Sequence, residues 1–283
     1  MQDVAIEQVR ARAHGMWAAV AGSWEAHASY VDTRAAGVTE RMLELADLRA
    51  GARVLELACG PGGLGLAAAE RVRLHGEVVL SDVVPEMVSI AARRAGALGL
   101  RNVSTRVLDL EEIDEPEASY DVVLCREGLM FAVDPARAAA EIRRVLRPGG
   151  RLVVAVWGPR ARNPWLGVIF DAVSAQLGRP VPPRGAPSPF SLDHADRLAA
   201  TLAAGGLSEV VVGELASPVC VASFDEWWSR TRGLAGPLTA ILQQLPEAAL
   251  QAVENRLRAA VAPYETTRGL EIPGVTLIAS ATA

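Results

Sequence analysis

The chain has 283 residues, 51% of them hydrophobic, and a formal net charge of −5. All 28 basic residues are arginine, so chemistry that needs a lysine amine, such as a Schiff base, is excluded. The arginines are spread among acids without a basic run, which argues against a nucleic-acid groove. No apolar stretch is long enough to cross a membrane, and Asp3 and Glu7 make the start unlike a secretory signal. We therefore expect a cytoplasmic protein, with neither nucleic acid nor membrane as partner.

The three cysteines, Cys59, Cys125 and Cys220, lack the spacing of a zinc site or a disulfide framework. Cys59 and Cys125 fall at the ends of predicted core strands, where cysteine behaves as a small hydrophobic residue. We expect no metal site.

Residues 1–50 are expected to form an N-terminal helical cap, because apolar side chains recur there at helical spacing. One face of this cap carries Trp17, Val20 and Trp24, with His27 one turn further on.

Residues 51–157 alternate between aliphatic or β-branched runs and amphipathic segments. Strands are predicted over residues 53–57, 77–81, 103–108, 120–125 and 150–157, with helices near 64–74, 85–98 and 135–146. This alternation is typical of an α/β fold with a Rossmann-like, doubly wound sheet.

The last third of the chain has a different texture. Residues 158–217 are expected to hold a proline-rich lid segment, a helix over 165–177, another helix opened by Ser191, and a sixth strand over 209–215. Residues 218–271 are expected to be a helical insertion, and residues 272–283 the final strand.

The segment 54–65, VLELACGPGGLG, has the pattern of a buried strand that turns sharply into its crossover helix. Gly60 and Gly62 allow backbone conformations closed to other residues and let a ligand lie against the peptide. Similar turns bind NAD and S-adenosylmethionine (SAM). Glu56, at the strand end, would repel a pyrophosphate by about 4 kcal/mol at ~4 Å and an effective dielectric of ~20, whereas SAM brings an ammonium and a sulfonium. The charge therefore favours SAM over NAD.

Two further acids end neighbouring strands, and such ends meet at one edge of a doubly wound sheet. Asp82 lies 20 residues beyond Gly62, where an acid can accept both ribose hydroxyls of an adenosine. Asp109 could accept a hydrogen bond from the adenine amine. For each acid, a helix N-cap or a turn residue is the alternative interpretation.

Five motifs taken together resemble the class I SAM-dependent methyltransferases, particularly the small-molecule branch that includes the ubiquinone and menaquinone biosynthesis enzymes. The motifs are VLELACGPGG, SDVVPEMV, VLDLEEI, YDVVLCREGLMF and EIRRVLRPGGRLVV, between about Val54 and Trp157. The resemblance implies an antiparallel final strand after the sheet's parallel ones. It departs at Ala58, where relatives often have glycine, and near Trp24, where they often have tyrosine.

The resemblance also implies a set of cofactor contacts. Gly60 and Gly62 would approach the methionine part of SAM, with Arg126 contributing backbone there, while Met87 would lie on the adenine face. The full cofactor set is predicted to be Glu56, Ala58, Gly60, Gly62, Asp82, Val83, Met87, Asp109, Leu110 and Arg126.

The acceptor pocket is expected in the segments that carry no cofactor motif. We predict that Trp17, Trp24, His27 and Trp165 bind the acceptor, with Phe190, Trp227 and Trp228 as further walls. Exposed tryptophans in the insertion would instead serve a homodimer interface.

If the acceptor needs a base, His27 and Glu127 are the candidates, with His194 as a further histidine near the site. A solvated or N-terminal-turn histidine and a salt-bridged rim glutamate are the alternatives.

The predicted function is SAM-dependent methyl transfer to an oxygen or carbon of a small, largely apolar or aromatic metabolite, natural-product or quinone-like. The alternatives are a SAM-binding enzyme that catalyses a rearrangement or cyclisation, a NAD-type oxidoreductase, and a noncatalytic binding module.

Overall fold

A seven-stranded sheet organises the protein, and its strand order is β3-β2-β1-β4-β5-β10-β6. The computed structural model describes residues 10–11, 14–73, 75–183 and 185–283. The strands are β1 (Arg53–Leu57), β2 (Glu77–Asp82), β3 (Val103–Val107), β4 (Tyr120–Arg126), β5 (Leu146–Trp157), β6 (Ser208–Ala216) and β10 (Val275–Thr282). The first five pair in parallel, and β10 runs antiparallel to both β5 and β6. The predicted doubly wound sheet with an antiparallel final strand is confirmed.

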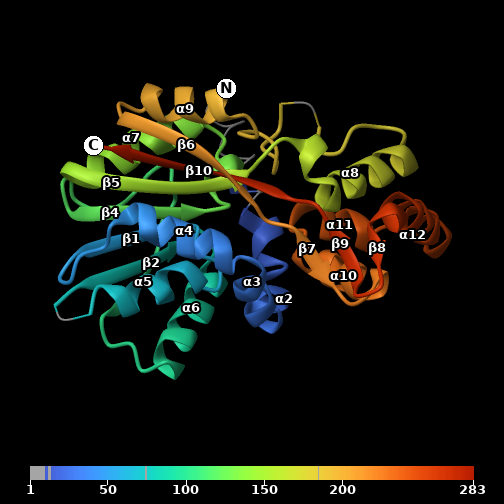
Figure 1. Cartoon of the computed structure of the whole chain (residues 1–283), viewed down its shortest axis with the longest axis horizontal. Coiled ribbons are helices and arrows are strands. Elements are labelled where there is room, and N and C mark those ends of the chain that lie inside the picture. The colour runs from blue at the N-terminus through green and yellow to red at the C-terminus, as the bar shows by residue number, and fades with distance from the viewer. Residues whose placement is uncertain (1–9, 12–13, 74, 184) are drawn as a thin grey trace.

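Helices cover both faces of the sheet (Figure 1). The helices α4 (Ala36–Ala46), α5 (Gly63–Arg71) and α6 (Pro85–Ala97) lie on one face, and α7 (Pro135–Val145) and α9 (Ala195–Ala204) on the other. Because both faces are covered, the central strands are almost uninterrupted runs of buried aliphatic residues. Asp134 accepts hydrogen bonds from the first backbone N–H groups of α7, as its position before a proline predicts. The helix predicted to open at Ser191 begins four residues later, at Ala195.

The N-terminal cap is broken into short helices. Within it, α2 (Ala21–Ala26) and α3 (Ala28–Arg34) meet at His27, whose backbone (φ −106°, ψ 12°) leaves the helical conformation. Residues 1–9 and 12–13 of the expected cap lie outside the described residues. The break matters because it ends the helical periodicity by which His27 was predicted to share a face with Trp24.

The insertion lies at one end of the molecule together with α8 (Pro164–Leu177), and α2 and α3 lie between it and the sheet (Figure 1). It contains α10 (Phe224–Leu234), α11 (Pro237–Gln243) and α12 (Glu247–Val261). It also contains a small antiparallel sheet of β7 (Val219–Val221), β9 (Gly269–Ile272) and β8 (Glu265–Thr266), which the helical patterning did not predict.

Trp227 and Trp228 of α10 are buried, with 1% and 4% of their surface exposed. The idea that exposed tryptophans of the insertion form a dimer interface is therefore wrong, because both rings pack inside the chain's own core. Among the described residues, no helix combines the length and the apolar character needed to cross a membrane.

Candidate active site

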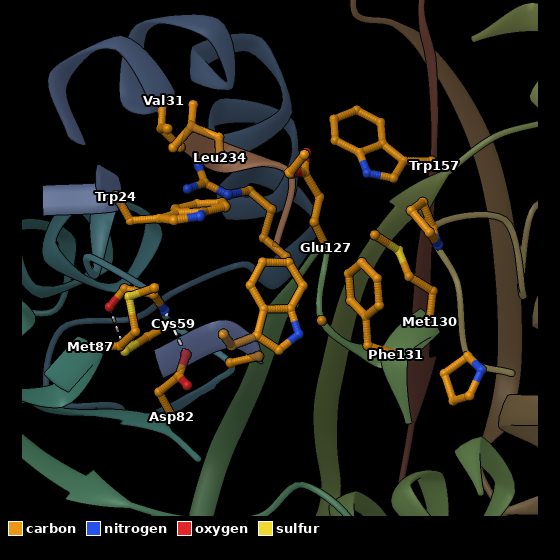
Figure 2. Close-up of a pocket in the computed structure, with 18 of the residues that line it drawn as sticks. Trp24, Val31, Cys59, Asp82, Met87, Glu127, Met130, Phe131, Trp157 and Leu234 are labelled. Carbon is orange, nitrogen blue, oxygen red and sulfur yellow. Dashed lines mark hydrogen bonds between the residues drawn. The ribbon is translucent and has the colours of Figure 1, made fainter. Parts of the chain in front are cut away.

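A cavity of about 260 Å³ opens at the carboxyl ends of β1, β2 and β4, the edge at which ligands bind in doubly wound sheets. Its wall is completed by α3, the end of β5, α8, α10, α11 and prolines of the segment 182–189. Figure 2 shows Trp24, Cys59, Asp82 and Met87 on one side and Trp157 and Met130 on the other. We call the first side the sheet-edge half. The second side is completed by α8 and by the insertion helices α10 and α11, and we call it the insertion half.

The turn after β1 runs through the left-handed region at Ala58 (φ +51°), Gly60 (φ +52°) and Gly62 (φ +86°). Asp82, at the end of β2, holds this turn: one carboxylate oxygen accepts from the Gly60 N–H at 2.9 Å and the other from the Val84 N–H at 3.0 Å. Asp82 is thus a turn residue and a cavity-lining residue at once. Each of its oxygens keeps a lone pair for a ligand hydroxyl.

The two glycines of the turn differ in what surrounds them. A Cβ on Gly60 would lie 3.8 Å from the Trp24 ring, on the cavity side. A Cβ on Gly62 would lie 3.1 Å from both Ala91 and Leu80, and Gly62 does not line the cavity. Gly62 is therefore required by its positive φ and its packing against α6 and β2, and the prediction that its missing side chain makes room for the cofactor is not supported.

Glu56 is buried, with 1% of its surface exposed, and still lines the cavity. Its Oε2 accepts from the Gly65 N–H at 2.9 Å, and a Cβ on Gly65 would come within 2.4 Å of that oxygen. Burial raises the pKa of Glu56 to about 8, although the nearby Arg126 guanidinium acts to lower it. A bound cation would favour the ionised carboxylate.

An aromatic cluster covers the sheet-edge half. Trp24 packs against the buried cluster that contains Met87, as Val83 does, and its ring centroid is 6.1 Å from that of Trp17. Trp17 also contacts Phe131, with ring centroids 5.1 Å apart. The structure thus places Trp17 and Trp24, predicted to bind the acceptor, beside the residues predicted to hold the cofactor. The buried Trp24 Nε1 has no hydrogen-bond partner within the described part of the chain.

The remaining predicted cofactor residues also line this half. Asp109 closes a turn, because its Oδ1 accepts from the Glu111 N–H at 2.8 Å. Arg126 donates through Nη1 to the Thr39 hydroxyl at 2.6 Å, so its side chain braces α4 against the strand end.

Glu127 joins the two halves. It follows β4 with a left-handed backbone (φ +59°), and its Oε2 accepts from the Arg34 guanidinium of α3 at 3.2 Å. The same guanidinium lies over the rings of Trp157 (4.9 Å) and Trp165 (5.5 Å). The buried Oε1 of Glu127 has no hydrogen-bond partner among the residues the structure describes.

The insertion half is mostly apolar and aromatic. Trp165 is held by its Nε1, which donates to Asn163 Oδ1 at 3.2 Å, and by an edge contact with Trp157 at 4.9 Å between centroids. The insertion reaches the cap through Arg230 of α10, whose guanidinium lies 4.0 Å from the centre of the Tyr30 ring. The wall also includes Leu166, Phe170, Pro182, Pro187, Pro189, Val219, Trp227, Thr231, Leu234 and Leu238.

Several predicted residues are not brought to the cavity. His27 is absent from its lining, and its Nδ1 donates to the Ser23 carbonyl oxygen at 2.9 Å, so the structure supports neither its catalytic nor its acceptor role. His194 is the N-cap residue of α9, as its alternative interpretation held. Phe190 and Trp228 likewise lie outside the lining.

Sequence reasoning missed other lining residues, notably Arg10, His14, Tyr30, Arg34 and Glu111. Tyr30 and Arg34 are four residues apart on α3, a spacing that puts them on one helix face and could have revealed them. Arg10 pairs with Glu111 across 101 residues, and the sequence holds no local signal for that contact.

The polar groups of the sheet-edge half fit SAM. Three carboxylates, Glu56, Asp82 and Asp109, face a cavity where an ammonium, ribose hydroxyls and an adenine amine would need acceptors. The unpartnered Trp24 Nε1 offers one buried donor to a ligand oxygen.

Comparison with known proteins agrees with this chemistry. Residues 48–164 match a family described as a methyltransferase domain. The ubiquinone/menaquinone biosynthesis C-methyltransferase of Hydrogenovibrio crunogenus is 31% identical over 177 residues, which are 62% of this chain and 69% of that protein. The nocamycin O-methyltransferase of Saccharothrix syringae is 33% identical over 154 residues, which are 52% of this chain and 55% of that protein. The chain thus spans between about half and two thirds of the length of these curated relatives.

Solved structures share the fold. The YcgJ protein of Bacillus subtilis superposes with a TM-score of 0.59 at 19% identity, covering 86% of this chain and 97% of that one. A Haemonchus contortus phosphoethanolamine N-methyltransferase solved with SAM gives a TM-score of 0.54 at 16% identity, covering 87% and 52%. Since the sheet order, the acidic edge of the cavity and the extended sequence match agree, this chain belongs to the class I SAM-dependent methyltransferases, and S-adenosylmethionine is its cofactor.

Proposed function

We propose that this protein transfers a methyl group from SAM to an oxygen or carbon of a small, largely apolar or aromatic metabolite of the natural-product or quinone type. One observation carries the proposal: a single cavity joins the acidic sheet-edge half to an aromatic insertion half, with Glu127 between them. Relatives that methylate oxygen and relatives that methylate carbon both support it.

When bound, SAM supplies a methyl group that the acceptor takes as the carbon–sulfur bond breaks and its electron pair returns to sulfur. The chain's part is to hold the acceptor in line and exclude water, which can account for much of the rate when reacting atoms are about 3–3.5 Å apart. Trp157, Trp165 and Phe170 would provide flat apolar surfaces for that purpose.

For a hydroxyl acceptor, Glu127 is the proposed general base. Its Oε1, which has no hydrogen-bond partner among the described residues, would accept the hydroxyl proton, while Arg34 holds Oε2. Arg34 is itself positioned by the Trp157 and Trp165 rings, so the orientation of the base depends on the insertion half.

The test is to incubate the purified protein with SAM and a panel of phenols, hydroxyquinones and polyketide-like alcohols, and to measure S-adenosylhomocysteine and methylated product by mass spectrometry. We expect both to form in equal amounts with at least one acceptor. Conversion of an acceptor without S-adenosylhomocysteine would favour the rearrangement or cyclisation alternative, and no conversion of any acceptor would contradict the proposal.

Family membership argues against the alternative of a NAD-type oxidoreductase. Cytoplasmic location and a homodimer stay predictions.

A further inference from the structure

Trp227 presents a buried hydrogen-bond donor at the cavity. The residue is 1% exposed, lines the cavity from α10, and its Nε1 has no acceptor among the residues described. A buried indole N–H usually has a partner, because leaving one unpaired is costly.

Trp228 shows that an unpaired indole alone is not a site. Its Nε1 is also buried without a partner in the described chain, but Trp228 does not line the cavity. What distinguishes Trp227 from Trp228 is that it shares one cavity with a second unpaired group of opposite polarity, the Oε1 of Glu127. Trp24 shares this property, but its ring lies in the sheet-edge half beside Gly60. A ligand that satisfied both would carry a donor and an acceptor on an otherwise apolar body.

We propose that the methyl acceptor carries two oxygen groups at separate positions on an apolar ring system: a hydroxyl that donates to Glu127, and a carbonyl or similar oxygen that accepts from the Trp227 Nε1–H. This inference rests on the proposed function and narrows its substrate class to hydroxylated carbonyl compounds. Trp227 is then a specificity-determining residue, because a compound without the second oxygen leaves its N–H unpaired.

Three probes with one skeleton test the proposal by calorimetric binding in the presence of S-adenosylhomocysteine. 6-Hydroxy-1-tetralone has both oxygens, 5,6,7,8-tetrahydro-2-naphthol has only the hydroxyl, and 1-tetralone has only the carbonyl. We expect the unsubstituted chain to bind the first probe roughly five- to tenfold more tightly than either of the others.

Two variants assign the groups. In Trp227→Phe the preference for 6-hydroxy-1-tetralone over the naphthol should disappear, whereas the control Trp228→Phe should keep it. In Glu127→Gln the preference for 6-hydroxy-1-tetralone over 1-tetralone should fall, while the preference for 6-hydroxy-1-tetralone over the naphthol should remain. If Trp227→Phe does not fold, indole NMR of the unsubstituted chain with ¹⁵N-tryptophan replaces it. The tetralones, but not the naphthol, should then shift one indole N–H signal that persists in Trp24→Phe and Trp228→Phe.

Equal binding of the three probes, an unchanged preference in Trp227→Phe, or no binding of any probe would overturn the proposal. These results are independent of turnover, so they are distinguishable from failure of the proposed function, which shows as an absence of S-adenosylhomocysteine with every acceptor.

Discussion

The two halves of the cavity are built by different kinds of contact. In the sheet-edge half, carboxylates accept from backbone N–H groups of the turn beside them, as Asp82 does from Gly60 and Glu56 from Gly65. Where the sheet-edge half meets the insertion half, side chains pair across long stretches of sequence, as Arg34 and Glu127 do across 93 residues. Backbone hydrogen bonds leave the carboxylates of the sheet-edge half little conformational freedom. Residues of the insertion half can be substituted without disturbing the turn after β1.

The largest expected effect comes from removing the proposed general base, which should impair catalysis and leave the sheet-edge half able to bind SAM. Glu127→Gln keeps the shape of the side chain but removes the proton acceptor, so turnover of a hydroxyl acceptor should fall by about 10²–10⁴-fold. SAM affinity, measured by calorimetry, should change less than about threefold, because that side chain faces Arg34. An equally large loss of SAM affinity would move Glu127 into the cofactor site.

The next effect concerns Glu56. Its raised folded-state pKa, about 8, means that between about pH 4.5 and 8 the folded chain holds a proton that the unfolded chain has lost. The free energy of unfolding should therefore fall as pH rises through this window, by about 1 kcal/mol per pH unit relative to Glu56→Gln.

Urea unfolding of both proteins from pH 5 to 8.5 measures that difference. The exposed Glu70, replaced by Gln, is the control and should show a parallel pH profile to the unsubstituted chain. If the difference in the free energy of unfolding between Glu56→Gln and the unsubstituted chain is constant with pH, burial does not raise the pKa of Glu56.

A pair of tryptophans sharpens the boundary between the halves. Trp24→Ala should weaken SAM binding by about tenfold, because the ring packs against the cluster that contains Met87 and lies beside Gly60. Trp165→Ala should instead raise the acceptor KM with little change in SAM affinity. If Trp24→Ala alters only acceptor kinetics, the assignment of Trp24 to the sheet-edge half is wrong.

The smallest expected effect is at Ala58. A left-handed conformation costs an alanine about 1–2 kcal/mol, and glycine removes that cost but gains entropy in the unfolded chain, so Ala58→Gly should stabilise the protein by up to ~1 kcal/mol. Ala92→Gly, on the exposed side of α6, should destabilise it by a similar amount. Thermal unfolding of the two variants measures both stability changes. A loss of stability in Ala58→Gly would contradict the prediction that the left-handed backbone at Ala58 costs stability.

The sequence by itself determined the alternating strands and helices, the turn at Gly60 and Gly62, and the acids at the strand ends. These features follow from local periodicity and backbone conformation, and every parallel strand brings its carboxyl end to the same edge. The tertiary structure decided which side chains face one another. His27 falls at a break between two short helices and outside the cavity lining, and Gly62 packs near Leu80 and Ala91. The short strands β7, β8 and β9 pair with one another in a segment expected to be helical. The Arg34–Glu127 contact joins the cap to the end of β4, and the Arg230–Tyr30 contact joins the insertion to the cap. Both pairs are far apart in the chain, so only tertiary packing brings them together.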